Sequence, residues 1–367
     1  MGRPMGHIRI LMSSRVLLDL EKADKIFKEK GLDAYRRYLL PKPGSDAYDP
    51  EIGGRRLQKG PLFDFAVAAL KLNQKAGYPV VEIGLSCKDE PDTAVPIFRS
   101  LDVQGLGDIE YRMAKSGHDL TKADHEAFGT DLLLTRNAND VQTAINNGVA
   151  AATVYTQPKG FNYKRNGDPI RIWVDGDAVA FGSSSEVRYR TEGLEIYREL
   201  EDRDFGDPIE AGPFTEILAK ISALNKKFPR GEQPFEIALV TARGGNAGAR
   251  ALTIATHHGI DFNGGTYFMG GSDKVNTLKA HKPDIFFDDQ MTHLKDSAEF
   301  CPTGLVAYAE GSPMHEYTEK LAAEQEKKAR QESKSAEMKD NGQSATQKAV
   351  TAKAPAAKPG NKPSGPR

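Results

Sequence analysis

Short apolar runs alternate with amphipathic segments along most of the chain. Apolar residues recur at helical spacing over residues 62–77 and 213–228, which predicts helices that cover a sheet. Short, mostly apolar runs predict strands at 7–12, 80–86, 131–135, 150–155, 171–174, 236–241, 284–289 and 304–309. Runs of this kind suit parallel strands that are buried on both faces. The alternation therefore predicts an α/β fold with a mainly parallel sheet.

The second half of the chain repeats the pattern of the first. The segment RIWVDGDAVAF (171–181) is followed by a helix and further strands, and IRILMSSRVLLDL (8–20) is followed by the same succession. The spacing and the strand character correspond. We therefore expect one α/β unit used twice, joined near residues 156–169, although two unrelated α/β domains would show a similar alternation.

Composition and charge narrow the class of protein. The chain has 367 residues, of which 39% are hydrophobic and 28% charged, and its formal net charge is −1. This length suits about two domains, and the balanced charge gives no electrostatic footprint for nucleic acid or a membrane surface. Cys87 and Cys301 provide neither a disulfide framework nor a zinc-binding spacing. We expect a soluble, cytoplasmic protein without a membrane span or a stable nucleic acid partner, whose oligomeric state, a homo-oligomer included, stays open.

Carboxylates, a hydroxyl and an ammonium group lie at or near the ends of predicted strands in the second half. In chain order they are Asp175 and Asp177, Thr241, Lys274, and Asp288 and Asp289. Ligands of open α/β sheets bind outside the carboxyl ends of the strands, so these side chains are expected to converge there. An acidic turn or a strand-end threonine alone is commonly structural. The ordered set of all of them points to a functional site.

These residue types match the needs of phosphoryl transfer. One carboxylate can attack phosphorus, and a second can protonate the leaving oxygen and then activate water. Several acids at one sheet edge supply the oxygen ligands of a hard cation, for which Mg²⁺ is the expected ion. Backbone N–H groups of Gly176, Asp177 and Ala242 can hold phosphate oxygens together with Thr241. Arg243 either reaches the phosphate or lies on the surface at the start of a helix.

The first half keeps the strands and loses the acids. Ser13 and Arg15 stand for Asp175 and Asp177, Ser86 for Thr241, and Thr135 and Arg136 for Asp288 and Asp289. We expect this half to be a catalytically silent copy. It completes the pocket, binds a regulatory nucleotide, or supplies only a packing surface.

Longer blocks of sequence resemble a known family. The segments VDGDAVAFGSSSE, LVTARGGNAGARAL and HKPDIFFDDQMTH resemble the haloacid dehalogenase superfamily of phosphohydrolases and, more closely, the cytosolic 5′-nucleotidase type I family. SSRVLLDLEKADKIFKEKGLDAYRRY and NANDVQTAINNGVAAATV in the first half resemble the same family. The resemblance covers about residues 7–312. It implies a Rossmann-like fold of the haloacid dehalogenase type and Mg²⁺-dependent hydrolysis of nucleoside 5′-monophosphates.

The resemblance also implies a role for each site residue. Asp175 would be the nucleophile, Asp177 the general acid and base, Thr241 a phosphate ligand, and Lys274 the group that neutralises charge. Metal would be held by Asp175, the backbone carbonyl of Asp177, and one or both of Asp288 and Asp289. A phosphatase for another small phosphomonoester and a nucleotide-sensing protein remain alternatives. His257, His258 and His293 lack metal-ligand spacing and are interpreted as structural.

The expected domain organisation follows from the same comparison. Residues 1–160 would form the acid-free unit and residues 161–322 the catalytic unit, with a small cap at about 183–214. In that superfamily the cap shapes the pocket, and its aromatic residues Tyr189, Tyr197 and Phe205 are expected to form a small core rather than to stack on a base. Residues 323–367 are expected to be helical and then disordered, with a basic tail too poor in apolar residues to fold.

Overall fold

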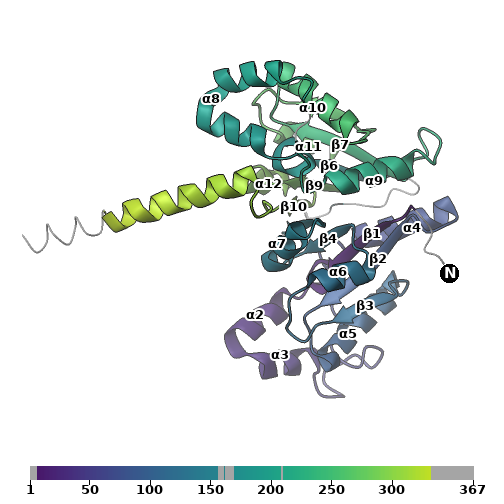
Figure 1. Ribbon diagram of the computed structural model, residues 1–367. Coiled ribbons are helices and arrows are strands. Elements are labelled where there is room, and N and C mark those ends of the chain that lie inside the picture. Colours follow the sequence, from purple (N-terminus) through teal and green to yellow (C-terminus); the bar gives the residue numbers. More distant parts are fainter. Residues whose placement is uncertain (1–5, 156–160, 162–168, 208–209, 332–367) are drawn as a thin grey trace, which may run out of the picture. The chain divides into compact units, whose positions relative to one another are not determined.

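The computed structural model describes residues 6–155, 161, 169–207 and 210–331 (Figure 1). Met1–His315 form one compact unit, and Glu316–Arg367 belong to a second. The strands of the first unit are β1 (Ile8–Ser13), β2 (Val81–Cys87), β3 (Tyr111–Ala114), β4 (Leu132–Thr135), β5 (Ala150–Val154), β6 (Ile170–Val174), β7 (Phe235–Thr241), β8 (Gly265–Phe268), β9 (Ile285–Asp288) and β10 (Thr303–Leu305).

All these strands join one sheet in the order β3-β2-β1-β4-β5-β10-β9-β6-β7-β8. Every neighbouring pair is parallel except β5 and β10, which run antiparallel, with Gly304 opposite Val154. A Cβ on Gly304 would lie 2.7 Å from the ring of Phe287, so glycine permits this junction. The predicted α/β fold with a mainly parallel sheet is confirmed, as a single sheet that spans both halves of the chain.

The two halves of the sheet have the same strand order. The first is β3-β2-β1-β4-β5 and the second, counted from the other edge, is β8-β7-β6-β9-β10. Loop contacts match as well, since the Lys115 N–H donates to the Cys87 carbonyl and the Met269 N–H donates to the Thr241 carbonyl, each at 2.9 Å. Cys87 therefore stands where Thr241 stands, and the expectation that Ser86 does so is wrong by one residue. The predicted boundaries at 160 and 322 stay predictions.

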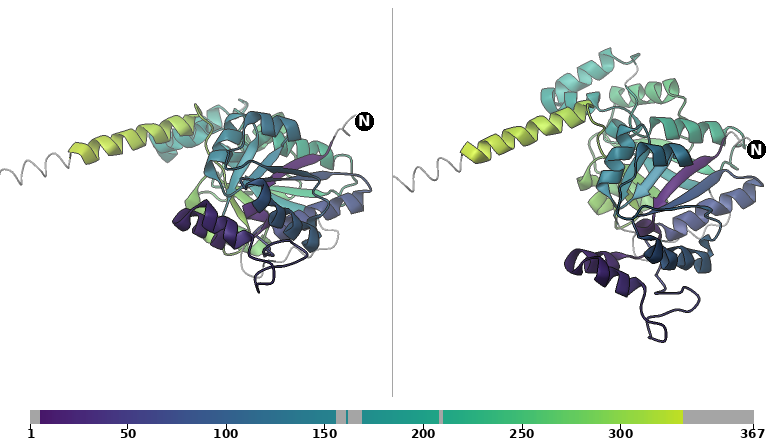
Figure 2. Two further views of the ribbon diagram at one scale, coloured as in Figure 1. Left: turned by 90° about the horizontal axis from the view of Figure 1, so that it is seen from below. Right: turned by 60° about the horizontal axis from the view of Figure 1, so that its bottom comes forward.

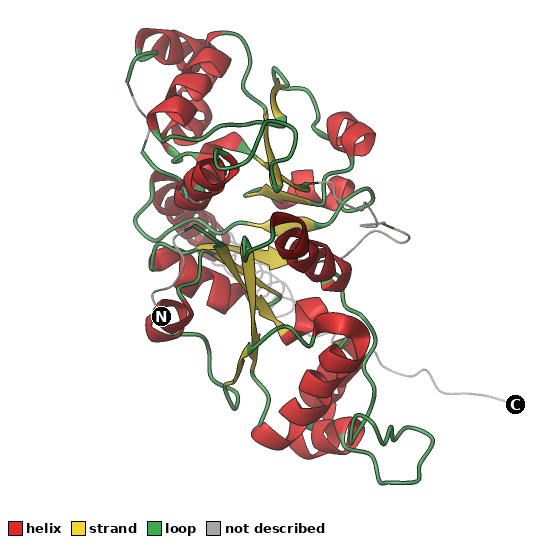
Figure 3. Cartoon of the chain, turned by 90° about the vertical axis from the view of Figure 1, so that its right-hand side faces the viewer, coloured by secondary structure: helices red, strands yellow, loops and turns green. Residues whose placement is uncertain are grey.

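Helices lie on both sides of the sheet (Figures 2 and 3). Each half carries an insertion between its first strand and its first covering helix. In Figures 1 and 2 the pair α2–α3 projects beyond the sheet, and α8, kinked at Gly193, is its counterpart. The helices are α1 (Ser14–Leu17), α2 (Glu21–Lys30), α3 (Leu32–Leu39), α4 (Phe63–Ala76), α5 (Pro91–Leu101), α6 (Lys122–Phe128), α7 (Ala138–Asn146), α8 (Ser184–Arg203), α9 (Thr215–Asn225), α10 (Asn246–His257), α11 (Val275–His281) and α12 (Met291–Ser297), with wide turns η1 (Asp102–Leu106) and η2 (Gly176–Ala180).

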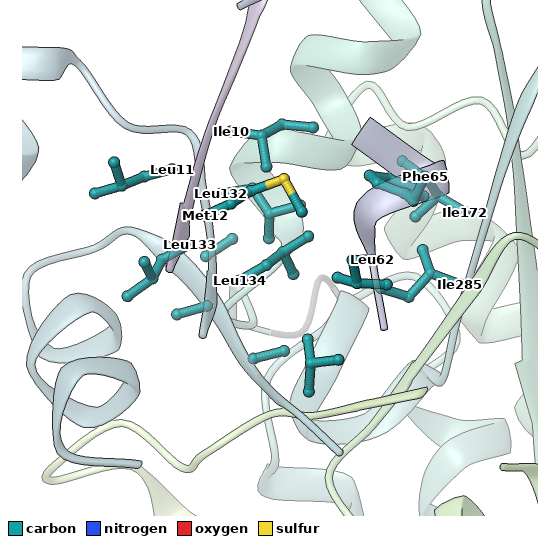
Figure 4. Close-up of a cluster of buried hydrophobic side chains, with 14 of the residues drawn as sticks. Ile10, Leu11, Met12, Leu62, Phe65, Leu132, Leu133, Leu134, Ile172 and Ile285 are labelled. Carbon is teal, nitrogen blue, oxygen red and sulfur yellow. The ribbon is translucent and has the colours of Figure 1, made fainter. Parts of the chain in front are cut away.

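One hydrophobic core runs through both halves. On the central strands, alternate side chains point to opposite faces, as Leu11 and Leu133 do relative to Ile10 and Leu132 (Figure 4). The side chain of Phe65, just inside α4, belongs to the same buried cluster as the apolar residues of β6 and β9. Removal of these aliphatic groups from water is the main stabilising contribution to the fold. It fixes the carboxyl ends of both sets of parallel strands in place.

The second unit is described only in part. Residues 316–331 are helical and largely exposed, which agrees with the exposed helix expected there. The segment expected to be disordered, residues 332–367, lies outside the described residues. Among the described helices, none is both long and apolar enough to cross a membrane. Cys87 and Cys301 are both buried free thiols.

Candidate active site

Asp175 lies directly after β6, where the chain enters the wide turn η2. Its N–H donates to the Phe287 carbonyl at 2.8 Å, and the Phe181 N–H closes the turn on the Gly176 carbonyl at 2.9 Å. A Cβ at Gly176 would lie 3.1 Å from the hydroxyl oxygen of Thr241, so glycine lets the turn approach the end of β7. The sequence DGD therefore folds into a tight acidic loop against the end of the neighbouring strand, and the Asp175 side chain is buried in it.

Lys274, which precedes α11, lies between two of the predicted acids. Its Nζ is 2.8 Å from Asp175 Oδ1 and 2.7 Å from Asp288 Oδ2, and only 2% of the residue is exposed. Burial alone would lower the pKa of Lys274, but the two carboxylates outweigh it and raise that pKa above its usual value. The ammonium group therefore stays charged and holds Asp175 and Asp288 together at the sheet edge.

The pKa values of the three carboxyl groups shift in different directions, although the groups lie close together. Burial raises the pKa of Asp175 to about 7, Lys274 opposes this rise, and the charge of Asp288 adds to it. Burial also acts on Asp288, but Lys274 and His293 lower the pKa of that carboxyl below its usual value. Burial and the neighbouring Asp175 and Asp288 raise the pKa of Asp289 well above its usual range. The cluster thus holds more acid than its one buried ammonium group can balance.

An additional cation would fit this excess of acid. Asp175, Asp288 and His293 each offer one ligand atom within 4.8 Å of the others, so this buried group could hold a metal ion. The carboxyl group of Asp289 also suits a metal ion. Its Oδ1 is buried and has no hydrogen-bond partner among the described residues, while its Oδ2 accepts the Tyr308 hydroxyl at 2.7 Å. The unbonded oxygen is the kind of donor that a hard cation takes.

His293 was missed as a site residue. His293 is the third residue of α12, and its Nδ1 lies 3.1 Å from Asp288 Oδ2, whereas spacing in the sequence favoured a structural role. His257, the last residue of α10, is exposed, His258 after it is half-buried, and neither belongs to the group that could hold a metal ion. The signal for His293 was its position four residues after the acidic pair, which places it on the first turn of the helix that begins beside Asp288.

Thr241 and Arg243 bring the end of β7 into the site. Thr241 is buried, and its hydroxyl accepts the Arg243 N–H at 3.2 Å, while Ala242 between them is exposed. The Arg243 guanidinium donates to both oxygens of Asp177, at 2.9 and 2.6 Å. Arg243 is 4% exposed, so the alternative of a surface arginine is wrong. Its guanidinium contacts carboxylates in this structure, and contact with a substrate phosphate stays a prediction.

Glu201, on helix α8 of the insertion, binds this arginine. Its Oε2 accepts Arg243 Nη1 at 2.6 Å, and its Oε1 accepts Arg250 Nη1 at 2.6 Å and the Ser185 hydroxyl at 2.7 Å. Glu201 is fully buried. A single carboxylate therefore links two arginines around α10 to the insertion, and through Arg243 it reaches Asp177. Nothing in the local sequence of α8 distinguishes Glu201 from the exposed acids around it.

Replacement of Glu201 by glutamine is expected to lower the free energy of unfolding by about 3–5 kcal/mol, because two buried guanidinium groups lose their shared counter-charge. It should also weaken the phosphoryl transfer predicted for this site, since the anchor of Arg243 beside Asp177 is loosened. Thermal unfolding and phosphate release would measure both effects. Glu199→Gln, on the exposed face of the same helix, is the matched control. A Glu201→Gln protein as stable and active as this control would contradict the anchoring role.

The aromatic residues of the predicted cap differ in burial. Tyr197 is buried and packs edge-on against Tyr189, with ring centroids 5.7 Å apart. Tyr189 and Phe205 remain 45% and 48% exposed. The expectation of a small helical core is confirmed for Tyr197 and wrong for the other two. Tyr189 lies on the face of α8 that is turned toward solvent, and Phe205 lies in the turn after α8 ends at Arg203.

Comparison with known proteins identifies the family of this chain. The profile of the 5′-nucleotidase family matches residues 3–313. This chain belongs to the 5′-nucleotidase family. The family consists of phosphomonoester hydrolases, and the chain is 28% identical over 304 residues to human cytosolic 5′-nucleotidase 1B. The matched region covers 80% of this chain and 47% of the relative, so the chain spans about half the length of that curated protein. No solved structure matches the chain.

Proposed function

We propose that the protein is a Mg²⁺-dependent 5′-nucleotidase that hydrolyses nucleoside 5′-monophosphates, AMP among them, through an aspartyl phosphate on Asp175. The observation that carries this proposal is the Asp175 carboxylate, buried at the end of β6 and held at 2.8 Å by Lys274. A carboxylate so held has a fixed orientation, and the ammonium group beside it can neutralise an approaching phosphate. Membership of the 5′-nucleotidase family supports the substrate class.

The chemistry would proceed in two displacements. An oxygen of Asp175 attacks phosphorus, the bond from phosphorus to the 5′ oxygen breaks, and Asp177 gives its proton to that oxygen as the nucleoside leaves. A water molecule then attacks the phosphorus of the aspartyl phosphate and gives a proton to Asp177. The bond from phosphorus to Asp175 breaks, which releases phosphate and restores the Asp175 carboxylate and the protonated Asp177. Thr241 and the N–H groups of Gly176, Asp177 and Ala242 would hold the phosphate oxygens throughout.

The pair of Asp177 and Arg243 has a part in this proposal. Both oxygens of Asp177 accept N–H groups of Arg243, so Asp177 cannot donate a proton until one of these bonds is replaced. A substrate phosphate would compete for the guanidinium, because phosphate and carboxylate offer it the same forked geometry. Substrate binding would thereby release one oxygen of Asp177 for proton transfer, while Glu201 keeps Arg243 in place.

The metal would lie among the acids. Asp175, the carbonyl of Asp177, and Asp288 or Asp289 would supply its oxygen ligands, and the unbonded Oδ1 of Asp289 supports the inclusion of that residue. When bound, Mg²⁺ would offset the charge of the phosphate oxygens and favour the ionised form of Asp175. His293 is a less suitable ligand for this hard cation, which prefers oxygen, and it would instead orient Asp288 through the contact at 3.1 Å.

A phosphate-release screen tests this function. With Mg²⁺ present, nucleoside 5′-monophosphates are expected to be hydrolysed faster than sugar phosphates, and chelation by EDTA should reduce release to background until Mg²⁺ is added in excess. Phosphate release would be lost in EDTA and recovered with Mg²⁺ because the cluster of acids repels a phosphate group unless a bound cation offsets its charge. A clear preference for sugar phosphates would favour the alternative phosphatase. Mg²⁺-dependent binding of AMP without phosphate release would favour a sensing protein.

A further inference from the structure

A cavity of about 450 Å³ lies in the acid-free half of the chain. It opens at the carboxyl ends of β1, β2 and β4, next to the insertion formed by α2 and α3. The volume falls in the range of small-molecule binding sites. The proposed hydrolysis in the second half makes no use of this cavity.

The sheet register shows that this cavity is the counterpart of the active site. Ile10 pairs with Ile83 and Leu132, as Ile172 pairs with Ile237 and Ile285. Counted from these pairs, Ser13 stands for Asp175, Arg15 for Asp177, Cys87 for Thr241 and Thr135 for Asp288. The matching loops add Asp89 for Arg243, because Ser116 N–H donates to the Asp89 carbonyl as Gly270 N–H donates to that of Arg243. All five first-half residues line the cavity.

The described part of the first half has no counterpart of the nucleophile or of the group that could hold a metal ion. The group of Asp175, Asp288 and His293 corresponds to Ser13, Thr135 and Asp140, of which only the last is an acid. Asp140 is committed elsewhere, since it accepts the Leu120 N–H at 3.1 Å and lies 3.3 Å from the Lys88 ammonium. Among the described residues, the group that could hold a metal ion lies in the second half, and the cavity has a serine where Asp175 stands.

The cavity still offers groups that an anion can use. The positions of the acid and the guanidinium are exchanged here. Arg15, after β1, stands for Asp177, and Asp89, after β2, stands for Arg243. Asp89 is occupied by the Tyr35 hydroxyl at 2.5 Å. Arg15 donates through Nη2 to Asp24 at 3.1 Å, but its buried Nε has no hydrogen-bond partner among the described residues, and neither has the hydroxyl oxygen of Ser13. Ser13 is the last residue of β1, Arg15 lies two residues further on in α1, and both line the cavity.

An apolar wall faces these polar groups. Phe27 and Leu32, on the insertion, line the cavity and yet are 48% and 39% exposed. Tyr35 packs edge-on against Phe27 with centroids 5.8 Å apart, and Leu120 adds a further apolar side chain to the lining. Exposed apolar side chains at the mouth of a cavity are typical of a site that covers a flat ligand. The cavity thus pairs a polar floor with an apolar, partly aromatic rim.

We propose that this cavity binds a nucleotide without a metal ion and without hydrolysing it. The phosphate would lie against Arg15 and Ser13, and the base would lie against Phe27 and Leu32. The chemical class of the ligand rests on the proposed function of the second half, because the two sites share one scaffold. The existence of a binding site rests only on the cavity and its unsatisfied polar groups.

Calorimetric titration of the full-length protein with AMP in EDTA tests this site apart from catalysis. One AMP per chain is expected to bind. Arg15→Met and Phe27→Ala should each weaken binding about tenfold or more, because they remove the phosphate partner and the stacking surface. Arg37→Met, an exposed arginine of the same insertion, should bind AMP as the unmodified protein does. Circular dichroism would confirm that each variant is folded, and Phe27→Ala, at an exposed side chain, keeps the test valid if Arg15→Met unfolds.

Two probes separate the parts of the ligand. Adenosine and inorganic phosphate are each expected to bind more weakly than AMP. Equal binding of adenosine and AMP would overturn the assignment of Arg15 to the phosphate. Equal binding of phosphate and AMP would overturn the assignment of the base to Phe27 and Leu32. No binding of AMP in EDTA, or binding that neither variant changes, would overturn the site itself, whereas failure of the proposed hydrolysis would appear only as missing phosphate release with Mg²⁺.

Discussion

Asp175→Asn is expected to reduce phosphate release from AMP by at least about a thousandfold, the scale of loss seen when a covalent nucleophile is removed. Asparagine keeps the size of the side chain and an oxygen that can accept the bonds now made by Gly176 N–H at 2.6 Å and by Lys274. It loses the negative charge and with it the ability to form an acyl phosphate. The fold should persist, because the replaced group keeps its contacts. Steady-state phosphate release with Mg²⁺ measures the effect.

A matched control separates chemistry from damage to the fold. Asp296→Asn, on the exposed face of α12, should hydrolyse AMP like the unmodified protein. Asp175→Ala, which cannot revert to aspartate by deamidation, should be as inactive as Asp175→Asn. Acid-quenched unmodified enzyme should carry a phosphoryl group on the peptide that contains Asp175, and the variants should not. Retention of more than about a tenth of the activity in both variants would contradict the assigned nucleophile.

The parts of the fold that could be predicted are those where one physical signal dominates. The interior strands, such as β1, β4 and β6, are mostly buried, so their sequences are mostly apolar and easy to recognise. The edge strands β3 and β8 were missed. Their residues are only half-buried, and a segment such as YRMA at 111–114 has no run or alternation that distinguishes it from a loop.

The same distinction holds for the site. Asp175 and Asp288 could be predicted to lie close together because strand ends are positions that the sheet brings together, and the structure places Lys274, which precedes α11, within hydrogen-bond distance of both. Glu201 was not found, because its contacts with Arg243 and Arg250 depend on how the insertion folds back over α10. Burial of a charged residue by a distant segment leaves no periodic signal in the local sequence.

The correspondence between the two halves shows a related limit. Strand character aligned the halves correctly at Ser13 and Thr135, where an apolar run ends in both. At the end of β2 a run of small residues, Ser86 and Cys87, left the alignment uncertain by one position, and the loop hydrogen bonds resolved it. This register matters, because it makes the cavity of the first half a residue-by-residue counterpart of the active site.

Lys274→Met is expected to reduce both stability and activity. The ammonium group is buried between Asp175 and Asp288, and its removal leaves two neighbouring carboxylates without their counter-charge. Breaking a buried ion pair in this way costs about 3–5 kcal/mol of unfolding free energy. Phosphate release should fall about a hundredfold or more, because the group that offsets charge on the phosphate is lost. Denaturant unfolding in EDTA and phosphate release with Mg²⁺ measure the two effects.

Added Mg²⁺ makes this variant a test of the metal site as well. A divalent cation bound to the same carboxylates would replace part of the missing positive charge, so Mg²⁺ should stabilise Lys274→Met more than it stabilises the unmodified protein. Lys279→Met is the control, because Lys279 is exposed on α11 and lies over the Phe300 ring at 5.2 Å, away from the acids. If Lys274→Met were as stable in EDTA as this control, the ammonium group would not be the counter-charge of the cluster. If Mg²⁺ stabilised both variants equally, the carboxylates around Lys274 would not be its ligands.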